Sequence, residues 1–248
     1  MGTRTLRFAT VFAALAISVS AGAVTYNAVS DFSTTSSTGV FSYGTGVTGT
    51  SFTAYTNYSA PCQGTVSGLG CWQTTTPTDL VPLVAKNLTG STFDFGTVVV
   101  PTDVLLLHPG PSTDSIVRFT VPITGHYNVS GFYEILDTSP TGVNVIIAFG
   151  AGGGPETVLL NAPLSGPPAI EPGTPGGFVP FGATNVLLHA GDIIDYGVNN
   201  AGNFSNDSTG LSLTFTSVPE PAMWAIMLVG FGVVGGALRR RSVAAVGA

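Results

Sequence analysis

Apolar and polar residues alternate most clearly between residues 115 and 149. Three successive runs, 115–121, 126–135 and 143–149, place their apolar residues at every second position. The residues expected to face inward are Val117, Phe119 and Val121, then Tyr127, Val129, Gly131, Tyr133 and Ile135, then Val143, Val145, Ile147 and Phe149. A period of two is typical of strands with one buried face. The spacing therefore predicts an antiparallel sheet.

Shorter strand signals extend this pattern on both sides. They lie at 25–29, 51–58, 97–100, 104–107, 157–160, 185–188, 191–198 and 211–216. The low-complexity segment 33–49 is expected to form a surface loop or a hairpin tip, and the segment 70–78 an exposed loop. The Gly- and Pro-rich segment 150–177 is the least regular. Ten to twelve strands without an amphipathic helix predict an all-β fold. We expect one antiparallel β-sandwich, a jelly roll, over residues 24–217.

Charge is scarce and unevenly distributed. Of the 248 residues 44% are hydrophobic and only 8% are charged, against roughly 25% in an ordinary soluble domain. The body, 24–217, contains two basic residues, Lys86 and Arg118, against twelve acidic ones, so its net charge is −10. An acidic body of this kind excludes nucleic acid as a partner, because it lacks the basic patch that phosphates require.

The N-terminus has the features of a signal peptide. Arg4 and Arg7 precede the apolar stretch 8–19, and Ala21-Gly22-Ala23 has the small-x-small form of a signal peptidase site. We predict a signal peptide over residues 1–23, with a retained membrane anchor as the alternative.

The two cysteines fit an exported protein. Cys62 and Cys71 enclose a Gly-rich segment, and two cysteines placed this way outside the cytoplasm are most simply joined by a disulfide. Closing a loop of this size is worth about 2–3 kcal/mol in the chain-entropy model.

The last thirty residues form a separate signal. Pro219-Glu220-Pro221 is followed by an uncharged apolar stretch, 222–238, and then by Arg239, Arg240 and Arg241. As a helix this stretch would span about 25 Å, at the short end for a bilayer crossing. Trp224 lies near one boundary, as an interfacial anchor does, and the positive-inside rule places the Arg cluster and residues 242–248 in the cytoplasm.

This order of features resembles the PEP-CTERM sorting signal, in the variant Pro219-Glu220-Pro221-Ala222-Met223-Trp224-Ala225. The resemblance covers residues 218–241 and implies an exosortase-type enzyme as a partner, which processes the tail. It also implies a transient membrane association through 222–238 and makes Glu220 and its prolines substrate positions. A plain C-terminal anchor is the alternative.

Short motifs in the body resemble exported bacterial jelly-roll modules that look like carbohydrate-binding sandwiches. They lie at 104–110, 118–122, 125–131, 191–195 and 206–210. The resemblance implies an exported envelope or extracellular-matrix protein of structural or adhesive role, associated with exopolysaccharide in a biofilm. A sugar-binding module is the alternative, and it would require exposed aromatic residues; the candidates are Tyr43, Tyr55, Tyr58 and Trp72.

Evidence for catalysis, metals and cofactors is sparse. The Gly-x-Ser-x-Gly and His-Glu-x-x-His motifs are absent, and no cofactor is predicted, so we do not expect an enzyme. Glu134 with Asp137, or Glu156 with Glu171, are candidates for the paired carboxylates of a glycosidase, but we expect all four to be solvated loop acids. His108 and His189 each end an apolar run and are candidates for a shared metal at one rim. Asp192, Asp195 and Asp207 are candidates for Ca²⁺, with turn formation as the alternative.

Overall fold

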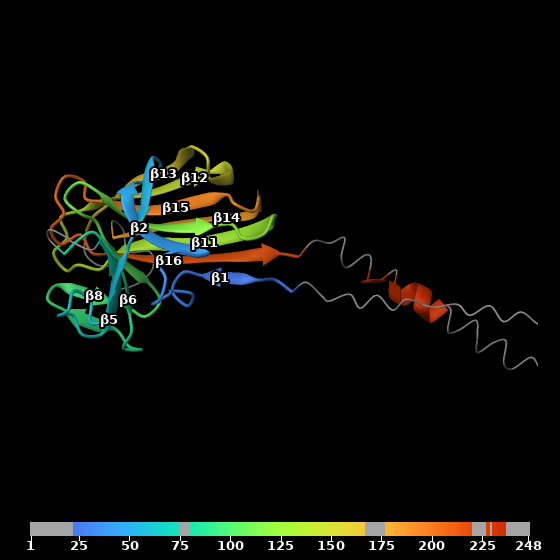
Figure 1. Cartoon of the computed structure of the whole chain (residues 1–248), viewed down its shortest axis with the longest axis horizontal. Helices are drawn as coiled ribbons and strands as arrows, with labels where there is room; N and C mark the ends of the chain where they lie inside the picture. The colour runs from blue at the N-terminus through green and yellow to red at the C-terminus, as the bar shows by residue number, and fades with distance from the viewer. Residues whose placement is uncertain (1–21, 75–79, 167–176, 220–226, 229, 237–248) are drawn as a thin grey trace, which may run out of the picture. The chain divides into compact units, whose positions relative to one another are not determined.

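The computed structural model describes residues 22–74, 80–166, 177–219, 227–228 and 230–236. Residues Ala23–Val218 form one compact unit, which contains sixteen strands in the described residues (Figure 1). Both clusters of buried apolar residues also lie inside it. This unit therefore has its own core and the means to fold by itself. The predicted signal peptide, apart from residues 22–23, lies outside the described residues.

Two antiparallel sheets make up this body. The first has the order β14-β11-β16-β9-β6-β5-β4, with β1 also paired to β16, and the second has the order β13-β12-β15-β10-β2-β3. The strands of the first sheet are β1 (Thr25–Asn27), β4 (Asn57–Ser59), β5 (Leu69–Gln73), β6 (Leu83–Asn87), β9 (Leu105–His108), β11 (Gly125–Ile135), β14 (Phe178–Leu188) and β16 (Thr209–Val218). Those of the second are β2 (Phe41–Val47), β3 (Ser51–Ala54), β10 (Asp114–Thr120), β12 (Val143–Gly150), β13 (Glu156–Leu164) and β15 (Ile193–Asn199). A small hairpin pairs β7 (Phe93–Phe95) with β8 (Val98–Val100).

The chain passes back and forth between the two sheets. From β9 to β12 each strand lies in the opposite sheet to the one before it, and the same holds from β13 to β16. This yields the four-strand orders β9-β16-β11-β14 and β10-β15-β12-β13, which is a jelly-roll-like arrangement of two antiparallel sheets. The predicted all-β class and antiparallel pairing are confirmed.

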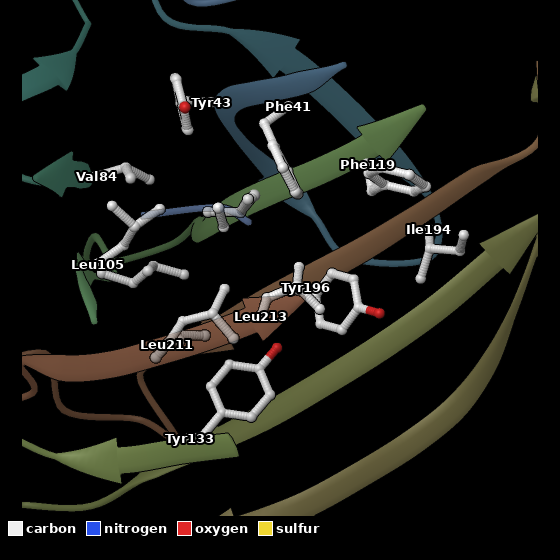
Figure 2. Close-up of a cluster of buried hydrophobic side chains, with 14 of the residues drawn as sticks. Phe41, Tyr43, Val84, Leu105, Phe119, Tyr133, Ile194, Tyr196, Leu211 and Leu213 are labelled. Atoms are coloured by element: carbon white, nitrogen blue, oxygen red, sulfur yellow. The ribbon is translucent and has the colours of Figure 1, made fainter. Parts of the chain in front are cut away.

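The main core lies between the sheets and is rich in aromatic rings. Phe119 of β10 and Phe215 of β16 stack with centroids 3.7 Å apart and an interplanar angle of 8°. Tyr127 and Tyr196 approach Phe215 edge-on. Figure 2 shows Phe119, Tyr196, Tyr133 and Leu213 converging from different strands. The inward face predicted for 115–121 is confirmed, because Val117, Phe119 and Val121 are all buried.

A second core covers the outer face of the first sheet. On β9, Leu105 and Leu107 point into the main core, whereas Leu106 joins a cluster with Cys62, Cys71 and Val98. The β7–β8 hairpin contributes Phe93, Phe95, Val98 and Val100 to this cluster. Strands β5, β6 and β9 are therefore buried on both faces.

Two predicted loops proved to be strands. The segment 33–49 contains β2, whose first four residues are buried, and the segment 70–78 begins with β5, whose five residues are all buried. Gly44 shows why small residues occur there: a Cβ at this position would lie 2.4 Å from the carbonyl oxygen of Thr53. The small residues in the segment 33–49, which indicated a loop, instead allow close packing of the backbone.

The tail contributes a helical segment at residues 227–228 and 230–236. Among the described residues, no helix has the length and apolar content needed to cross a bilayer. The described helical residues cover only part of the stretch 222–238, over which a spanning helix is predicted. The remainder of that stretch, together with Glu220, Pro221, Trp224 and the Arg cluster, lies outside the described residues, whereas Pro219 directly follows the end of β16.

Candidate functional site

A cleft of about 490 Å³ opens beside the disulfide, and we call it the disulfide cleft. Its walls come from the loop after β4, the approach to β6, the β7–β8 turn, the end of β9, and the segments that follow β11 and precede β16. The lining residues are Cys62, Gln63, Val66, Leu69, Leu80, Val81, Leu83, Phe95, Gly96, Thr97, Val98, Leu106, His108, Asp137, Phe204, Ser205, Asn206 and Ser208. The volume and the mixture of apolar walls with a few polar groups are typical of small-molecule sites.

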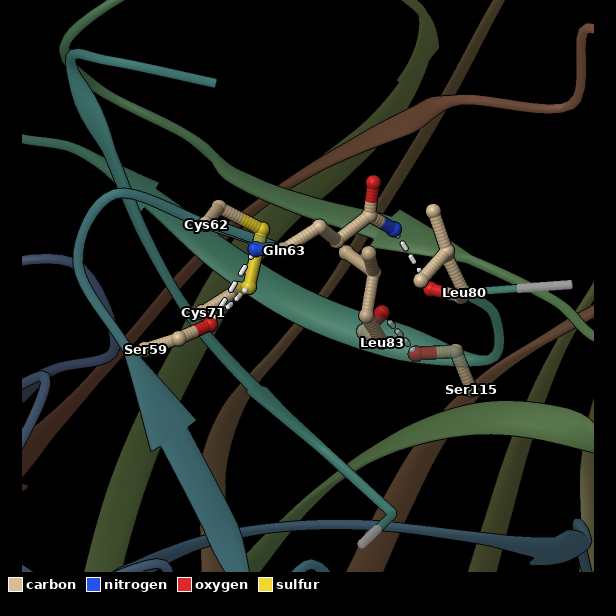
Figure 3. Close-up of a disulfide and its surroundings, with 7 residues drawn as sticks. All are labelled: Ser59, Cys62, Gln63, Cys71, Leu80, Leu83 and Ser115. Carbon is tan, nitrogen blue, oxygen red and sulfur yellow. Dashed lines mark hydrogen bonds between the residues drawn. A yellow bond between two sulfur atoms is a disulfide. The ribbon is translucent and has the colours of Figure 1, made fainter. Parts of the chain in front are cut away.

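The disulfide holds one wall of the cleft in place. Cys62 and Cys71 are bonded, with Cα atoms 5.1 Å apart. Gln63, which follows Cys62, donates a hydrogen bond from its backbone N–H to Oγ of Ser59 at 3.1 Å, and its Nε2 donates to the carbonyl oxygen of Leu80 (Figure 3). The loop is therefore tied both to β5 and to the chain that enters β6.

His108 and Asp137 are the ionisable side chains that line the cleft. Nδ1 of His108 lies 2.9 Å from the carbonyl oxygen of Pro109. Burial lowers the pKa of His108, although the Pro109 hydrogen bond and the charge of Asp137 oppose this. A carbonyl oxygen only accepts, so Nδ1 carries the proton and Nε2 of the neutral ring is an acceptor. The fully buried Asp137 supplies further acceptor oxygens.

Backbone strain is concentrated around the cleft. Five non-glycine residues in the described part of the chain have positive φ, and three of them, Gln63 (55°), Leu80 (62°) and Asn206 (57°), line it. A positive φ is unfavourable for a branched residue such as Leu80. Strained residues of this kind gather at ligand-binding and catalytic sites, where the fold enforces a particular geometry.

The aromatic residues predicted as an exposed sugar platform lie elsewhere. Tyr43, Tyr55 and Trp72 are buried in the main core, so this prediction is wrong for all three. Tyr58 is half-buried and packs on Trp72, with ring centroids 5.2 Å apart. Tyr43 is on β2 and Trp72 is on β5, and both side chains face the main core. The partly exposed rings in the cleft are instead Phe95 and Phe204.

The two histidines do not share a rim. His108 ends β9, whose Leu107 pairs with Thr209 at the start of β16. His189 follows Leu188, which pairs with Gly125, and the neighbouring His126 pairs with Val218 at the end of β16. The histidines therefore lie near opposite ends of β16, and the predicted shared metal site is wrong.

The carboxylates proposed as catalytic pairs have other surroundings. Glu134 is in β11; burial and the charge of Asp103 raise its pKa to about 7. Glu156 is in β13, where its Oε1 accepts a hydrogen bond from Arg118. Neither is a solvated loop acid as expected, because both are on strands and partly or largely buried. Glu171 lies outside the described residues.

The three aspartates considered for Ca²⁺ are separated by their partners. Asp195 pairs with Arg118, Asp192 accepts hydrogen bonds from the N–H groups of Gly152 and His189, and Asp207 contacts Thr141. Within the residues that the structure describes, no three His, Cys, Asp or Glu side chains are placed to hold one metal ion. Asp192 and Asp195 thus stabilise the fold through these contacts.

Several cleft residues escaped the sequence reading. Gln63, Leu80, Phe204 and Ser205 belong to no strand and to no motif, whereas Asn206 begins the motif 206–210. The available signal is the sequence Asn-Asp-Ser-Thr from Asn206, in which Asp207 is a candidate for Ca²⁺ with turn formation as the alternative. The cleft depends on loops from distant parts of the chain, so a local pattern does not reveal it.

The tail has a counterpart among known protein families. Residues 217–241 match the PEP-CTERM protein-sorting motif. This motif implies export, processing by an exosortase-type enzyme and transient membrane association through the C-terminus. The predicted sorting motif is confirmed, whereas the specific variant with Trp224 stays a prediction.

The body resembles solved structures only distantly. The carbohydrate-binding module TmCBM61, solved with β-1,4-galactotriose, is 16% identical over 55% of this chain and 81% of its own, with a TM-score of 0.31. CBM35 from Paenibacillus barcinonensis is 16% identical over 52% and 88%, with a TM-score of 0.28. The K2 cleaved adhesin domain of Lys-gingipain is 9% identical over 79% and 98%, with a TM-score of 0.36. No curated protein matches the chain. These similarities are too distant to indicate a ligand.

Proposed function

We propose that this chain is an exported envelope or matrix protein that binds exopolysaccharide through the disulfide cleft. Its role is structural or adhesive, and it acts by binding, without catalysis. The sorting motif at 217–241 supports export. The cleft supports a carbohydrate ligand, and its composition is the observation on which the proposal rests.

Hydroxyl-rich ligands need donors and acceptors placed next to apolar surface, because a sugar ring presents both kinds of face. In the cleft, Asn206 and Gln63 carry side-chain amides, and His108 carries an acceptor nitrogen. Phe95 and Phe204 supply aromatic surface beside them. The single acidic side chain in the lining, Asp137, and the net charge of −10 on the body disfavour anionic polymers. The ligand expected is therefore a neutral glycan.

Replacing His108 with alanine should weaken glycan binding about tenfold, which corresponds to about 1.4 kcal/mol. The matched control is His189→Ala, since His189 lies near the opposite end of β16 and its side chain is largely exposed. Residues 23–218 would be screened on an array of neutral bacterial glycans, and the best ligand measured by titration calorimetry. No binding at millimolar glycan, or equal losses in both variants, would contradict the proposal.

The tail is proposed to hold the protein at the membrane until it is processed, with the Arg cluster in the cytoplasm. A chain that ends at Val218 keeps all sixteen strands but lacks the rest of the sorting motif. We expect this chain to leave the membrane fraction and to collect in the soluble exported fraction, as detected by immunoblotting. Retention of the shortened chain in the membrane fraction, at the level of the full-length protein, would show that another part of the chain anchors it.

A further inference from the structure

An excess of acceptor oxygens surrounds the hydroxyl of Thr141, in the segment between β11 and β12. Its Oγ1 lies 3.2 Å from the carbonyl oxygen of Asn203, 2.7 Å from that of Ser205 and 2.6 Å from Oδ1 of Asp207. A hydroxyl carries one hydrogen and can satisfy one of these acceptors. The other two oxygens are left for water or for a bound group, since Asn203 and Ser205 are exposed.

Asp207 strengthens this conclusion independently. Its side chain is fully buried, and Oδ2 has no hydrogen-bond partner among the described residues. A buried carboxylate oxygen without a partner is costly and requires a compensating charge or donor.

Basic side chains do not supply that compensation. The body has two basic residues, and Arg118 is already paired with Asp195 and Glu156. Lys86 is on β6 and forms no ion pair in the part of the chain that the structure describes. A cation from solution is the remaining source of positive charge.

We propose that the segment 203–207 and Thr141 form a Ca²⁺ site. The ligands are the carboxylate of Asp207, the carbonyl oxygens of Asn203 and Ser205, and Oγ1 of Thr141, with water completing the six to eight oxygens that Ca²⁺ takes. Backbone carbonyls at irregular positions suit Ca²⁺ better than Mg²⁺, which requires near-octahedral geometry and keeps its water. Because Phe204, Ser205 and Asn206 line the disulfide cleft, the ion also orders one wall of that cleft.

The test uses residues 23–218 and Ca²⁺ alone, without glycan, so its outcome is independent of the proposed function. Relative to EDTA, 10 mM Ca²⁺ should raise the Tm by about 3–10 °C, given the 10⁻⁴–10⁻³ M affinities of extracellular sites. Asp207→Asn keeps the size of the side chain but removes its charge, and should abolish the shift. The matched control, Asp94→Asn, changes an exposed aspartate on β7 and should retain it.

Thr141→Val provides a second variant if Asp207→Asn does not fold, because Thr141 is exposed and its replacement leaves the core unchanged. It should weaken Ca²⁺ binding at least several-fold in titration calorimetry. The absence of a Ca²⁺-dependent shift in the unmodified protein, or equal shifts in the Asp207 and Asp94 variants, would overturn the proposal. An equal response to Mg²⁺ would contradict the assignment to calcium.

Discussion

Replacing Arg118 with methionine should lower the free energy of unfolding by about 3 kcal/mol. Arg118 donates from Nε and Nη2 to both oxygens of Asp195, at 2.6 and 2.7 Å, and from Nη2 to Oε1 of Glu156 at 2.7 Å. Its guanidinium carbon also lies 4.3 Å from the centroid of the Phe52 ring. Removing one partner of a buried ion pair leaves the other charge uncompensated, which typically costs 3–5 kcal/mol. The lower end of this range of free energies is expected because the Arg118 side chain is 18% exposed and partly screened by water.

The local electrostatics explain why this loss is large. Burial lowers the pKa of Arg118, but the hydrogen bonds and charges of Asp195 and Glu156 outweigh it and raise the pKa. Burial and the charge of Asp195 raise the pKa of Glu156, and Arg118 only partly offsets them. Two carboxylates therefore share one cation, and its removal would leave both of them in a region with little water.

The measurement is urea-induced unfolding of residues 23–218, followed by circular dichroism. The matched control is Lys86→Met, which removes the other basic side chain of the body and should cost less than about 1 kcal/mol. Adding Asp195→Asn to Arg118→Met should recover part of the loss, because the unpaired charge is then gone. Equal losses in the two single variants would show that the network contributes no specific stabilisation.

Replacing Phe119 with alanine should lower the free energy of unfolding by about 3–5 kcal/mol, as expected for truncation of a buried aromatic ring. Phe119 is fully buried and contacts the rings of Tyr26, Phe41 and Phe215, which belong to three other strands from both sheets. The cavity left behind would separate the two sheets at the centre of the main core.

Thermal and urea unfolding of Phe119→Ala would be compared with Ile123→Ala, in which the replaced side chain is 63% exposed and should cost less than about 0.5 kcal/mol. If the Phe119 variant were as stable as the Ile123 variant, the stacked pair would not be a central support of the sandwich.

Pattern reading succeeded where the signal is local. The strands within 115–149 were predicted because the opposite sheet covers one face of each strand, which favours apolar residues at every second position. Pattern reading failed at β2, where close approach of the backbone places Gly, Ser and Thr among the apolar residues. It failed at β5 because this strand is buried on both faces, so its residues do not alternate. The placement of Tyr43 and Trp72 failed for the same reason.

The candidate site was less accessible to pattern reading. The partners of Arg118 are set by the antiparallel register of β10 with β15, which places Arg118 opposite Asp195, 77 residues further along the chain. The acceptors around Thr141 come from residues more than 60 positions away. No local spacing encodes such contacts, since they depend on which strands become neighbours in the sandwich.

The amino-acid sequence by itself determined the all-β class, the antiparallel pairing and the sorting motif at 217–241, because each depends on residues that are close together along the chain. Only the tertiary structure decided that His108 and His189 lie near opposite ends of β16. It also decided that Asp192, Asp195 and Asp207 make separate contacts, and that loops from distant parts of the chain enclose one cleft. These features arise from strand order and register, which bring distant residues together and are specified by the packing of the whole sandwich.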